Sequence, residues 1–407
     1  MTSSSHHFAP GADQRAGGAL AVLRLVHERP GISRSEAARA LGMSSSTTTE
    51  LTARLRAQAL LDERAPGPAR GRGRPSGLLV AHPDGPIVGA VEITHGRWRV
   101  AAVELGGRTV EAREGQRPRD PGAALAEIRR GFSKLHDAVA GRIRAISVSV
   151  SGTVSGSRVV QAATLRWFDV DLGPLVPTAL RGLPFVAGND ATLAGLAEAR
   201  RGAATEARVA LYLAVEVGIG GVLVVDGRPF VGAQGEGGEF GHMPFGSEGL
   251  RCPCGACGCW DLDVDGRALA RALGHRAPAD PRTFAAHVIA AARAGDPAES
   301  AAVDVVTRAL GRGTGALVNA LDPDLVVYGG LAPDLRAAAH PAHDAAFHDA
   351  LMRHRRDDPP PIVASALGPD ASLLGAAERG FDLVLTASLL GHSKRAGAAV
   401  PLSPSPP

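Results

Sequence analysis

The chain has 407 residues, 45% of them hydrophobic, and its net charge is only +3. Its length predicts two or three domains with substantial cores, and its small net charge excludes a protein that is basic throughout. No apolar run approaches the ~20 residues that span a bilayer, and the polar N-terminus does not resemble a signal peptide. We therefore expect a cytoplasmic protein with no membrane partner.

Charge is unevenly distributed along the chain. Residues 1–81 contain eleven arginines and six acidic residues, a net charge of +5, whereas the remainder has 33 basic and 35 acidic residues, a net charge of −2. A basic N-terminal part on a slightly acidic body indicates that the N-terminal part meets a polyanion. The composition of residues 1–17 and 392–407 predicts disordered termini.

Residues 18–81 are predicted to form a small helical domain. Apolar spacing predicts a helix over residues 19–28, which a Pro-Gly pair ends. Ser33 and Glu36 form a capping box that starts the second helix, because the Ser33 hydroxyl can accept a bond from a free backbone N–H while Glu36 reaches back. A short glycine turn leads to a third helix, which Ser44 can cap.

This third helix has the features of a DNA recognition helix. In a helix, short turn and helix arrangement, the second helix enters the major groove with its N-terminal residues at the base edges. We expect Leu51 and Leu55 to face the core, and the small hydroxyl side chains near the helix start to be exposed, where they can bind phosphates or bases. The same pattern also occurs in any three-helix bundle. The predicted contacts on this helix are Ser45, Ser46, Thr48, Thr49 and Arg54.

The segment after the third helix is predicted to form a wing. Two short apolar strands flank a loop over residues 66–77 that is rich in arginine and glycine. Arginine on such a loop fits a narrow minor groove. A solvated linker between domains is the alternative. The predicted wing contacts are Arg70, Arg72 and Arg74.

From residue 86 onward, β-branched runs alternate with alanine- and leucine-rich helices. This pattern predicts a mixed α/β sheet duplicated in two lobes. Asn189 and Asp190 follow an apolar run and precede a helix, which places a carboxylate at a strand-to-helix corner, where open α/β sheets bind ligands. Residues 218–221 follow a strand and predict a tight turn against a ligand or phosphate. The predicted strands cover residues 87–93, 100–105, 143–150, 209–217, 222–225 and 325–328.

All four cysteines lie within eight residues, ten residues after His242. Glycine and proline between them let the backbone fold around one point, so the cluster predicts a metal, and zinc prefers such nitrogen and sulfur ligands in a tetrahedron. Disulfides or free thiols are the alternatives, but loops this short would strain a disulfide and nothing else indicates an oxidising compartment. Spacing alone does not distinguish an all-cysteine site from one that includes His242.

The order of these features resembles the ROK family of repressors, open reading frames and kinases. The resemblance covers nearly the whole chain and implies an α/β protein: an N-terminal winged helix-turn-helix, then a two-lobed actin-like ATPase fold of the sugar-kinase, ribonuclease-H-like class over residues 86–391. It rests on the cysteine cluster and on Ser-Gly-Thr-Val at 151–154, Asn-Asp-Ala at 189–191, Gly-Ile-Gly-Gly at 218–221, Gly-Glu-Phe-Gly-His at 238–242, Asp-Pro-Asp-Leu-Val-Val-Tyr-Gly-Gly at 322–330 and Leu-Gly-Ala-Ala at 374–377.

The resemblance also implies roles for individual residues. Asp190 matches the base that deprotonates the attacked sugar hydroxyl. Asp261 and Thr164 stand where the family usually has Glu and Asn, so common hexose specificity does not follow. The implied zinc ligands are His242, Cys252, Cys254 and Cys259, with Cys257 spare. The implied sugar contacts are Gly152, Thr164, Asn189, Asp190, Glu239, His242 and Asp261.

Both phosphate loops of the family's kinases are altered. The Asp-x-Gly-x-Thr loop is Glu-Ile-Thr-His-Gly at residues 92–96, where Thr94 blocks close approach of the backbone to phosphate. The Gly-Thr-Gly loop is Glu-Val-Gly at residues 216–218, and Val217 has no side-chain donor. The Glu216 carboxylate near a triphosphate would cost about 3–4 kcal/mol per close contact at an effective dielectric of 20. We therefore do not expect ATP to bind.

The leading hypothesis is a one-component transcription regulator, expected to be a repressor of carbohydrate genes, that senses a sugar without phosphorylating it. Its expected partners are double-stranded DNA at an inverted repeat and a carbohydrate effector, and it is expected to be a homodimer or homotetramer with structural zinc. Asp190 would then bind ligand and be vestigial as a base. The alternatives are an active sugar kinase with an accessory DNA-binding head, and a DNA-binding protein whose body only dimerises.

Overall fold

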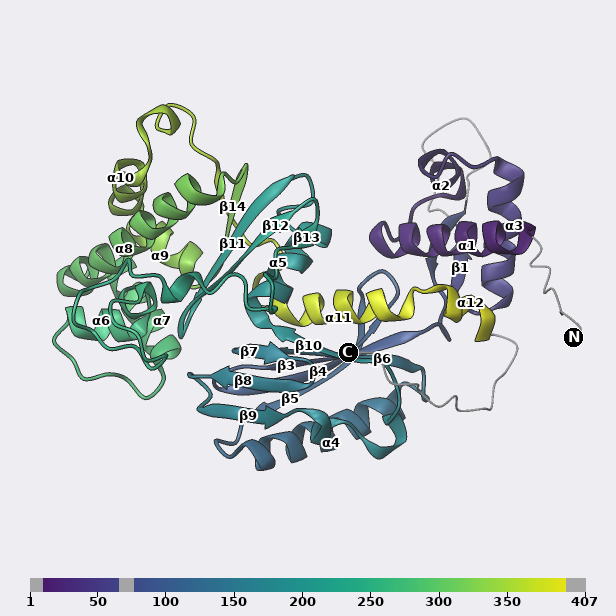
Figure 1. Cartoon of the computed structure of the whole chain (residues 1–407), viewed down its shortest axis with the longest axis horizontal. Coiled ribbons are helices and arrows are strands. Elements are labelled where there is room, and N and C mark those ends of the chain that lie inside the picture. The colour runs from purple at the N-terminus through teal and green to yellow at the C-terminus, as the bar shows by residue number, and fades with distance from the viewer. Residues whose placement is uncertain (1–9, 66–76, 393–407) are drawn as a thin grey trace, which may run out of the picture.

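The computed structural model describes residues 10–65 and 77–392 (Figure 1). A head precedes a body of two lobes, each built on a five-stranded sheet. The head consists of α1 (Pro10–Glu28), α2 (Arg34–Ala40), α3 (Ser45–Ala57) and the antiparallel pair β1 (Leu61–Arg64) and β2 (Leu78–Ala81).

The head matches most of the sequence prediction. Ser33 and Glu36 form the capping box of α2, and the Ser44 hydroxyl caps α3 by accepting a bond from Thr47 N–H at 3.0 Å. Helix α1 begins at Pro10, so it covers residues that were predicted to be disordered. The predicted wing contacts, Arg70, Arg72 and Arg74, lie outside the described residues, between β1 and β2.

One predicted DNA contact on α3 is wrong. Thr48 is fully buried, and its hydroxyl donates to the Ser44 carbonyl at 3.1 Å, because position 48 shares the core-facing side of the helix with Leu51 and Leu55. Ser45, Ser46, Thr49 and Arg54 are exposed, as expected.

Lobe I contains a sheet of order β10-β6-β3-β4-β5, in which β3 pairs with β4 antiparallel and with β6 parallel. Figure 1 shows α4 on one face of this sheet and α11 on the other. A second, three-stranded sheet extends from the end of β6. The elements are β3 (Ile87–Ile93), β4 (Arg97–Glu104), β5 (Thr109–Gln116), α4 (Pro121–Ala138), β6 (Ile143–Val150), β7 (Thr153–Ser155), β8 (Arg158–Ala162), β9 (Trp167–Asp171), β10 (Phe185–Asn189), α11 (Ala371–Val384) and α12 (Ala387–His392).

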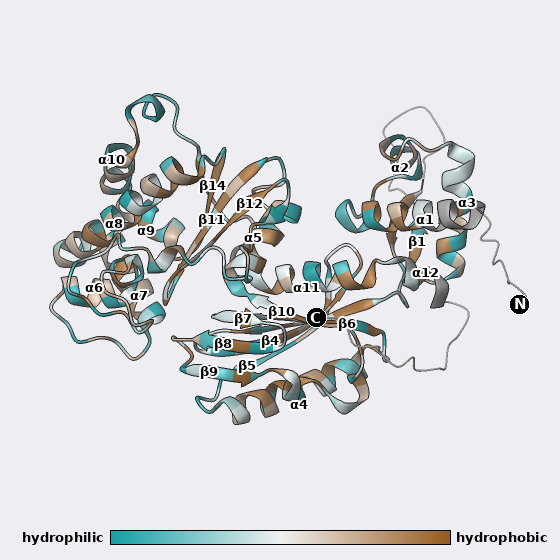
Figure 2. Cartoon of the chain, viewed as in Figure 1, coloured by the Kyte–Doolittle hydropathy of each residue, from teal (hydrophilic) through white to brown (hydrophobic). Residues whose placement is uncertain are grey.

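Lobe II contains a sheet of order β13-β12-β11-β14-β15. Helix α5 covers one face, and α6 to α10 share a core with the other. Figure 2 shows that β11, β12 and β14 are largely hydrophobic, as expected for strands covered on both faces. The elements are α5 (Asp190–Arg201), β11 (Val209–Glu216), β12 (Gly218–Val225), β13 (Arg228–Pro229), α6 (Gly266–Ala272), α7 (Pro281–Arg293), α8 (Pro297–Leu321), β14 (Leu325–Gly330), α9 (Ala332–Ala338), α10 (His340–Ala350) and β15 (Ile362–Ala364).

The six strands predicted for the body are present as β3, β4, β6, β11, β12 and β14, with ends shifted by a few residues. The turn predicted at residues 218–221 is confined to its beginning. Gly218 has a φ of +106° and pairs with Glu216 across a tight hairpin, whereas the following residues continue β12. No helix among the described residues is long and apolar enough to cross a bilayer.

Helices α5 and α11 lie between the two sheets and touch each other closely. A Cβ atom on Gly375 of α11 would stand 1.8 Å from the carbonyl oxygen of Leu193 on α5. This distance leaves no room for a side chain, so glycine is required for the two helix backbones to meet. The contact joins the lobes, because α5 packs on the sheet of lobe II and α11 on that of lobe I.

We expect Gly375→Ala to lower the free energy of unfolding by at least ~2 kcal/mol, since a backbone atom must move to admit the methyl group. Urea titration of the full chain measures this change. The control is Gly17→Ala in α1, where an added Cβ meets no atom within 4 Å. The control should be neutral or slightly stabilising because alanine favours helix. Equal stability of the two variants would contradict the close contact.

Candidate metal centre and ligand cleft

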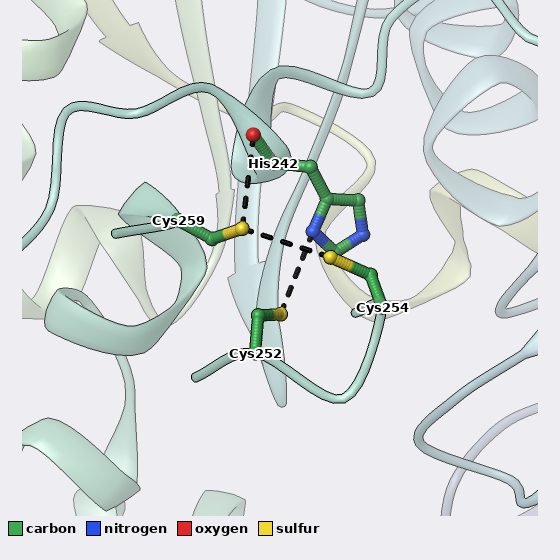
Figure 3. A group of neighbouring side chains, drawn as sticks. All are labelled: His242, Cys252, Cys254 and Cys259. Atoms are coloured by element: carbon green, nitrogen blue, oxygen red, sulfur yellow. Dashed lines mark hydrogen bonds between the residues drawn. The ribbon is translucent and has the colours of Figure 1, made fainter. Parts of the chain in front are cut away.

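Four side chains between β13 and α6 converge on one point (Figure 3). Ligand atoms of His242, Cys252, Cys254 and Cys259 all lie within 4.8 Å of one another. The Cys254 and Cys259 Sγ atoms are 3.7 Å apart, and Cys252 Sγ is 3.8 Å from His242 Nδ1. Two sulfurs bound to one zinc at ~2.3 Å are roughly 3.8 Å apart in a tetrahedron, whereas a disulfide needs about 2.05 Å. The spacing fits zinc and excludes a disulfide.

The chemistry of the cluster also fits a cation. Burial raises the pKa of the Cys252 thiol, and burial together with the neighbouring thiols raises that of Cys259 to about 12. Three sulfurs this close therefore lose their protons together when a metal offsets their charge. The cluster is thus a Cys₃His set that could bind zinc. Cys257 is exposed and lies outside it, as the family resemblance implies.

The metal loop is shaped by glycine and anchored by tryptophan. Gly255 and Gly258 have φ angles of +103° and +70°, and Cys252 N–H donates to the Ala256 carbonyl at 2.8 Å, which closes the loop. Trp260 follows directly, is fully buried, and donates its indole N–H to the Ala309 carbonyl of α8 at 2.9 Å. The cluster is therefore held against the core of lobe II.

His242 connects the metal cluster to the place where side chains of the two lobes meet. Its Nδ1 faces Cys252, and its Nε2 lies 3.8 Å from Glu239 Oε2. Glu239 in turn accepts a 3.4 Å hydrogen bond from Thr153 Oγ1 of lobe I. A metal on Nδ1 would fix the ring so that Nε2 faces Glu239 and the cleft.

Asp190 is the first residue of α5, where its carboxylate contacts Ser151 at the end of β6 in lobe I. Its carboxylate accepts bonds from Ser151 Oγ at 2.5 Å and from Ala191 N–H at 2.9 Å. Desolvation raises the pKa of Asp190 to about 6, against the lowering effect of these two bonds, and the nearby Glu216 and Glu92 carboxylates add to the rise. A carboxylate with this pKa can hold a sugar hydroxyl or accept its proton near neutral pH.

Asn189 and Gly152 complete this side of the cleft. Asn189 caps α5 through a 3.0 Å bond from Thr192 N–H to Oδ1, and its Nδ2 donates to the Gly152 carbonyl at 3.2 Å. A Cβ on Gly152 would stand 2.5 Å from the Ala162 Cβ, so the strand β8 packs directly on its backbone. The strand-to-helix corner predicted from the sequence is present.

Two predicted sugar contacts are placed differently. Asp261 is buried, and its two carboxylate oxygens accept bonds from Ile219 N–H at 2.6 Å and from the Arg267 guanidinium at 3.3 Å. Thr164 lies in the turn between β8 and β9 and makes no hydrogen bond to the other predicted sugar contacts, all of which are described. Their role in binding sugar stays a prediction.

The family is shown by comparison with known proteins. The family model described as ROK family matches residues 88–379, well over half of the chain. The chain belongs to the ROK family.

ROK proteins of two kinds are similar to this chain. The glucokinase of Streptomyces coelicolor is 28% identical over 273 residues, which cover 63% of this chain and 84% of the kinase. The xylose repressor of Caldicellulosiruptor bescii is 25% identical over 331 residues, which cover 76% of this chain and 82% of the repressor.

A solved ROK structure matches the head as well as the body. The crystal structure of a ROK family transcriptional regulator, a homologue of the E. coli MLC protein, has a TM-score of 0.72 and 23% identity, covering 93% of this chain and 98% of its own. Residues 86–407 are 322 of the 407 residues, or about 79%, so a match over 93% must include most of the head. This likeness confirms the fold predicted from the sequence.

The two segments that match the family's phosphate loops contain ion pairs between residues of this chain. Glu92 is buried and binds both arms of the Arg99 guanidinium, at 2.6 and 2.9 Å. Ser372, in the first turn of α11, donates to the same carboxylate at 2.5 Å. At the second loop, Arg282 of α7 donates to Glu216.

These pairs change the reason for expecting little nucleotide binding. Arg282 offsets the charge of Glu216, so like-charge repulsion contributes less than the sequence suggested. Instead, the carboxylates at these two positions are each paired with an arginine of the chain itself.

These arginines were not predicted from the sequence, although one was recognisable. In the β3–β4 hairpin, Glu92 lies directly opposite Arg99, and opposite charges across an antiparallel pair attract. The register of this hairpin, counted from its turn at residues 94–96, predicts the pairing of Glu92 with Arg99. Ser372 and Arg282 are far from their partners in sequence and gave no such signal.

Freshly purified protein is expected to contain about one zinc per chain, because the Cys₃His set has the four ligands of a closed structural site. Cys259→Ser should lose the metal and lower the melting temperature, since metal binding and folding are coupled. Cys257→Ser is the matched control and should keep both. Elemental analysis showing equal zinc in the two variants would rule out this ligand set.

Asp190→Asn should stabilise the protein near neutral pH. The pKa of about 6 lies above the ordinary 3.8, so the native state binds the proton more tightly than the unfolded state does. The contribution of Asp190 to stability is therefore largest below about pH 4 and falls as the pH rises towards 6, by roughly 2–3 kcal/mol for a shift of about two pKa units.

Urea titrations from about pH 4 to pH 8 test this dependence, which the asparagine variant should lack. Asp120→Asn, at the exposed N-cap of α4, is the control, because asparagine caps a helix as well as aspartate does. A pH profile of Asp190→Asn that follows the wild type would contradict the raised pKa.

Proposed function

We propose that this ROK protein is a transcription regulator that binds DNA through its head and responds to a sugar bound between its lobes. One contrast carries the proposal. At the predicted sugar site, Asp190 accepts a bond from Ser151, Asn189 donates to the Gly152 carbonyl, and Thr153 donates to Glu239 across the two lobes. At the segments that match the family's phosphate loops, by contrast, the Glu92–Arg99 and Glu216–Arg282 ion pairs are present. Similarity to a xylose repressor and to a structurally solved ROK regulator supports the same conclusion.

The head supplies the surface for DNA. The start of α3 exposes Ser45, Ser46 and Thr49, and Arg54 is exposed further along. The Thr49 hydroxyl donates to the Ser45 carbonyl at 2.8 Å, so it would meet DNA as a hydrogen-bond acceptor. Such side chains bind phosphates and base edges when a recognition helix enters the major groove. The basic loop between β1 and β2, with Arg70, Arg72 and Arg74, would add phosphate or minor-groove contacts. The site is then an inverted repeat bound by a symmetric dimer, or by a tetramer made of two dimers.

The body supplies the ligand site. Its polar groups at the cleft come from both lobes, with Asp190, Asn189 and Gly152 on one side and Glu239 with His242 on the other. A sugar held by both sides would bind one arrangement of the lobes better than another, and it can shift that balance only by this difference in affinity. Zinc would then act structurally, by orienting His242 and the segment that carries Glu239.

Sugar phosphorylation is the second candidate function. Similarity to a glucokinase and the raised pKa of Asp190 favour it, because a carboxylate with that pKa can serve as a general base. The ion pairs at both phosphate loops favour the regulator. We therefore expect negligible ATP turnover with D-glucose or D-xylose in a coupled assay.

Selection of bound fragments from genomic DNA tests the regulator directly. Wild-type protein should enrich fragments that contain an inverted repeat, and Thr49→Ala should bind them about fivefold more weakly, as expected for loss of one hydrogen bond of about 1 kcal/mol. Thr48→Ser is the control, because a buried serine keeps the bond to the Ser44 carbonyl and faces away from DNA.

Two outcomes would overturn the proposal. One is an absence of enriched fragments. The other is robust sugar-dependent ATP turnover that Asp190→Asn abolishes, which would assign the protein to the kinases instead.

A further inference from the structure

The helix α5 carries a ligand residue at one end and contacts the head at the other. Asp190 is its first residue, and Arg200 and Arg201 are its last. Twelve residues of α-helix span roughly 18 Å, so one rigid element joins the cleft to the base of the head.

Arg201 binds three different parts of the molecule. It donates to the carbonyl oxygen of His27 in α1 at 2.9 Å and to that of Gly106, in the β4–β5 turn, at 3.0 Å. Its Nε donates to Glu378 of α11. Head, lobe I and α5 therefore meet at a single guanidinium, which is mostly buried.

His27 is the head's own contribution to this joint. It is 5% exposed, and its Nδ1 accepts a 3.0 Å bond from Gly106 N–H. A neutral ring then carries its proton on Nε2, which points at Glu378 Oε2 at 3.1 Å. Its ring also lies 4.4 Å from that of Phe381, centroid to centroid. Both ring nitrogens and one face are thus used in contacts with the body.

Glu378 is held as an anion at the centre of the joint. Burial alone would raise its pKa, but the hydrogen bond from His27 and the charge of Arg201 bring the pKa down to about 2. Arg200 adds a 3.3 Å bond to the same carboxylate and pairs with Asp382. We call His27, Arg201 and Glu378 the head joint.

Helix α11 runs alongside α5 and has contacts at the same two places. Ser372 at its beginning binds Glu92 in the altered phosphate loop, and Glu378 and Phe381, further along, contact the head. Figure 1 shows α11 extending from between the lobes to the head. Because Gly375 meets the Leu193 carbonyl without a side chain between them, α5 cannot shift across α11 without moving it.

The head is also packed on the body through apolar side chains. Val22, Leu23 and Val26 of α1 are buried in the same core as Phe381 and Leu385. Arg24 donates to the Leu385 carbonyl at 3.1 Å, which adds a polar contact at the edge. The head is therefore seated on the end of α11, and its orientation follows the position of that helix.

We propose that α5 and α11 act as one strut that transmits the ligand state at Asp190 to the orientation of the head through the head joint. The sugar ligand and the DNA in this inference rest on the proposed function. The mechanical coupling between Asp190 and the head does not depend on that function. A sugar that engages Asp190 shifts the strut, and Arg201 and Glu378 carry the shift to His27. In a symmetric dimer, a small rotation of each head is enough to change the spacing of the two recognition helices.

A double-mutant cycle on the full chain, read by hydrogen exchange, tests the strut without any effector. The variants are Asp190→Asn, His27→Gln and the double variant, and the readout is the exchange rate of backbone amides in residues 19–28 of α1. Asp190→Asn should change these rates at least threefold, although it lies at the far end of α5. In the His27→Gln background, the change should shrink by at least half, since coupling energy appears as non-additivity.

Arg336→Met is the control for loss of a half-buried polar side chain that lies away from the head joint. Arg336 binds Asp344 and the Ile362 carbonyl within lobe II, away from α5 and the head. The Arg336→Met substitution should leave the response of α1 exchange to Asp190→Asn unchanged. If α1 does not respond to Asp190→Asn, or responds equally with and without His27, the strut is wrong and the joint is only a structural anchor.

A parallel arm with D-glucose and D-xylose separates the inference from the proposed function. If either sugar binds and changes the exchange rates of α1 in the wild type, but changes them less in His27→Gln, both the strut and the proposed function are supported. If neither sugar binds but the double-mutant cycle shows coupling, the strut is supported, and these two sugars are not the effectors. If a sugar binds but the effects of the two substitutions on α1 exchange are additive, the strut is wrong and the proposed function still holds.

Discussion

The backbone contact between α5 and α11 is the constraint on which the rest of the structure depends. Each of the three large parts is packed on one of these helices: lobe II on α5, lobe I on one face of α11, and the head on the far end of α11. The contact exists because Gly375 has no side chain. A single glycine thus fixes how two sheets and a helical domain are arranged around one cleft.

Much of the fold could be predicted from local sequence patterns. The capping box of Ser33 and Glu36, the six β-branched runs and the Asn189–Asp190 corner each specify their own structure within a few residues, and all of them are present. Thr48 shows the limit of such reasoning. Its hydroxyl suggests a surface position, but helical periodicity sets its direction, and position 48 falls on the same side as Leu51 and Leu55.

The candidate site was predictable where its residues are close in sequence. The Cys₃His cluster depends on one loop, so its members could be identified, although the choice of His242 over Cys257 came from family resemblance. The partners of Asp261, Ile219 N–H and Arg267, were not predicted from the sequence, and its role in binding sugar stays a prediction. The head joint joins residues 27, 201 and 378 and contacts the backbone of residue 106, and no local pattern connects positions so distant.

The Glu92–Arg99 pair has a consequence for how this protein could evolve. Glu92 also binds Ser372, and Arg99 also binds Asp370 and the Pro369 carbonyl, so the pair is a shared support for the start of α11. Shortening Glu92 to aspartate would weaken one of the two ion pairs of a largely buried arginine and loosen the start of α11. Substitutions that restored the family's loop at this position would therefore have to be accompanied by changes at Arg99 or Ser372.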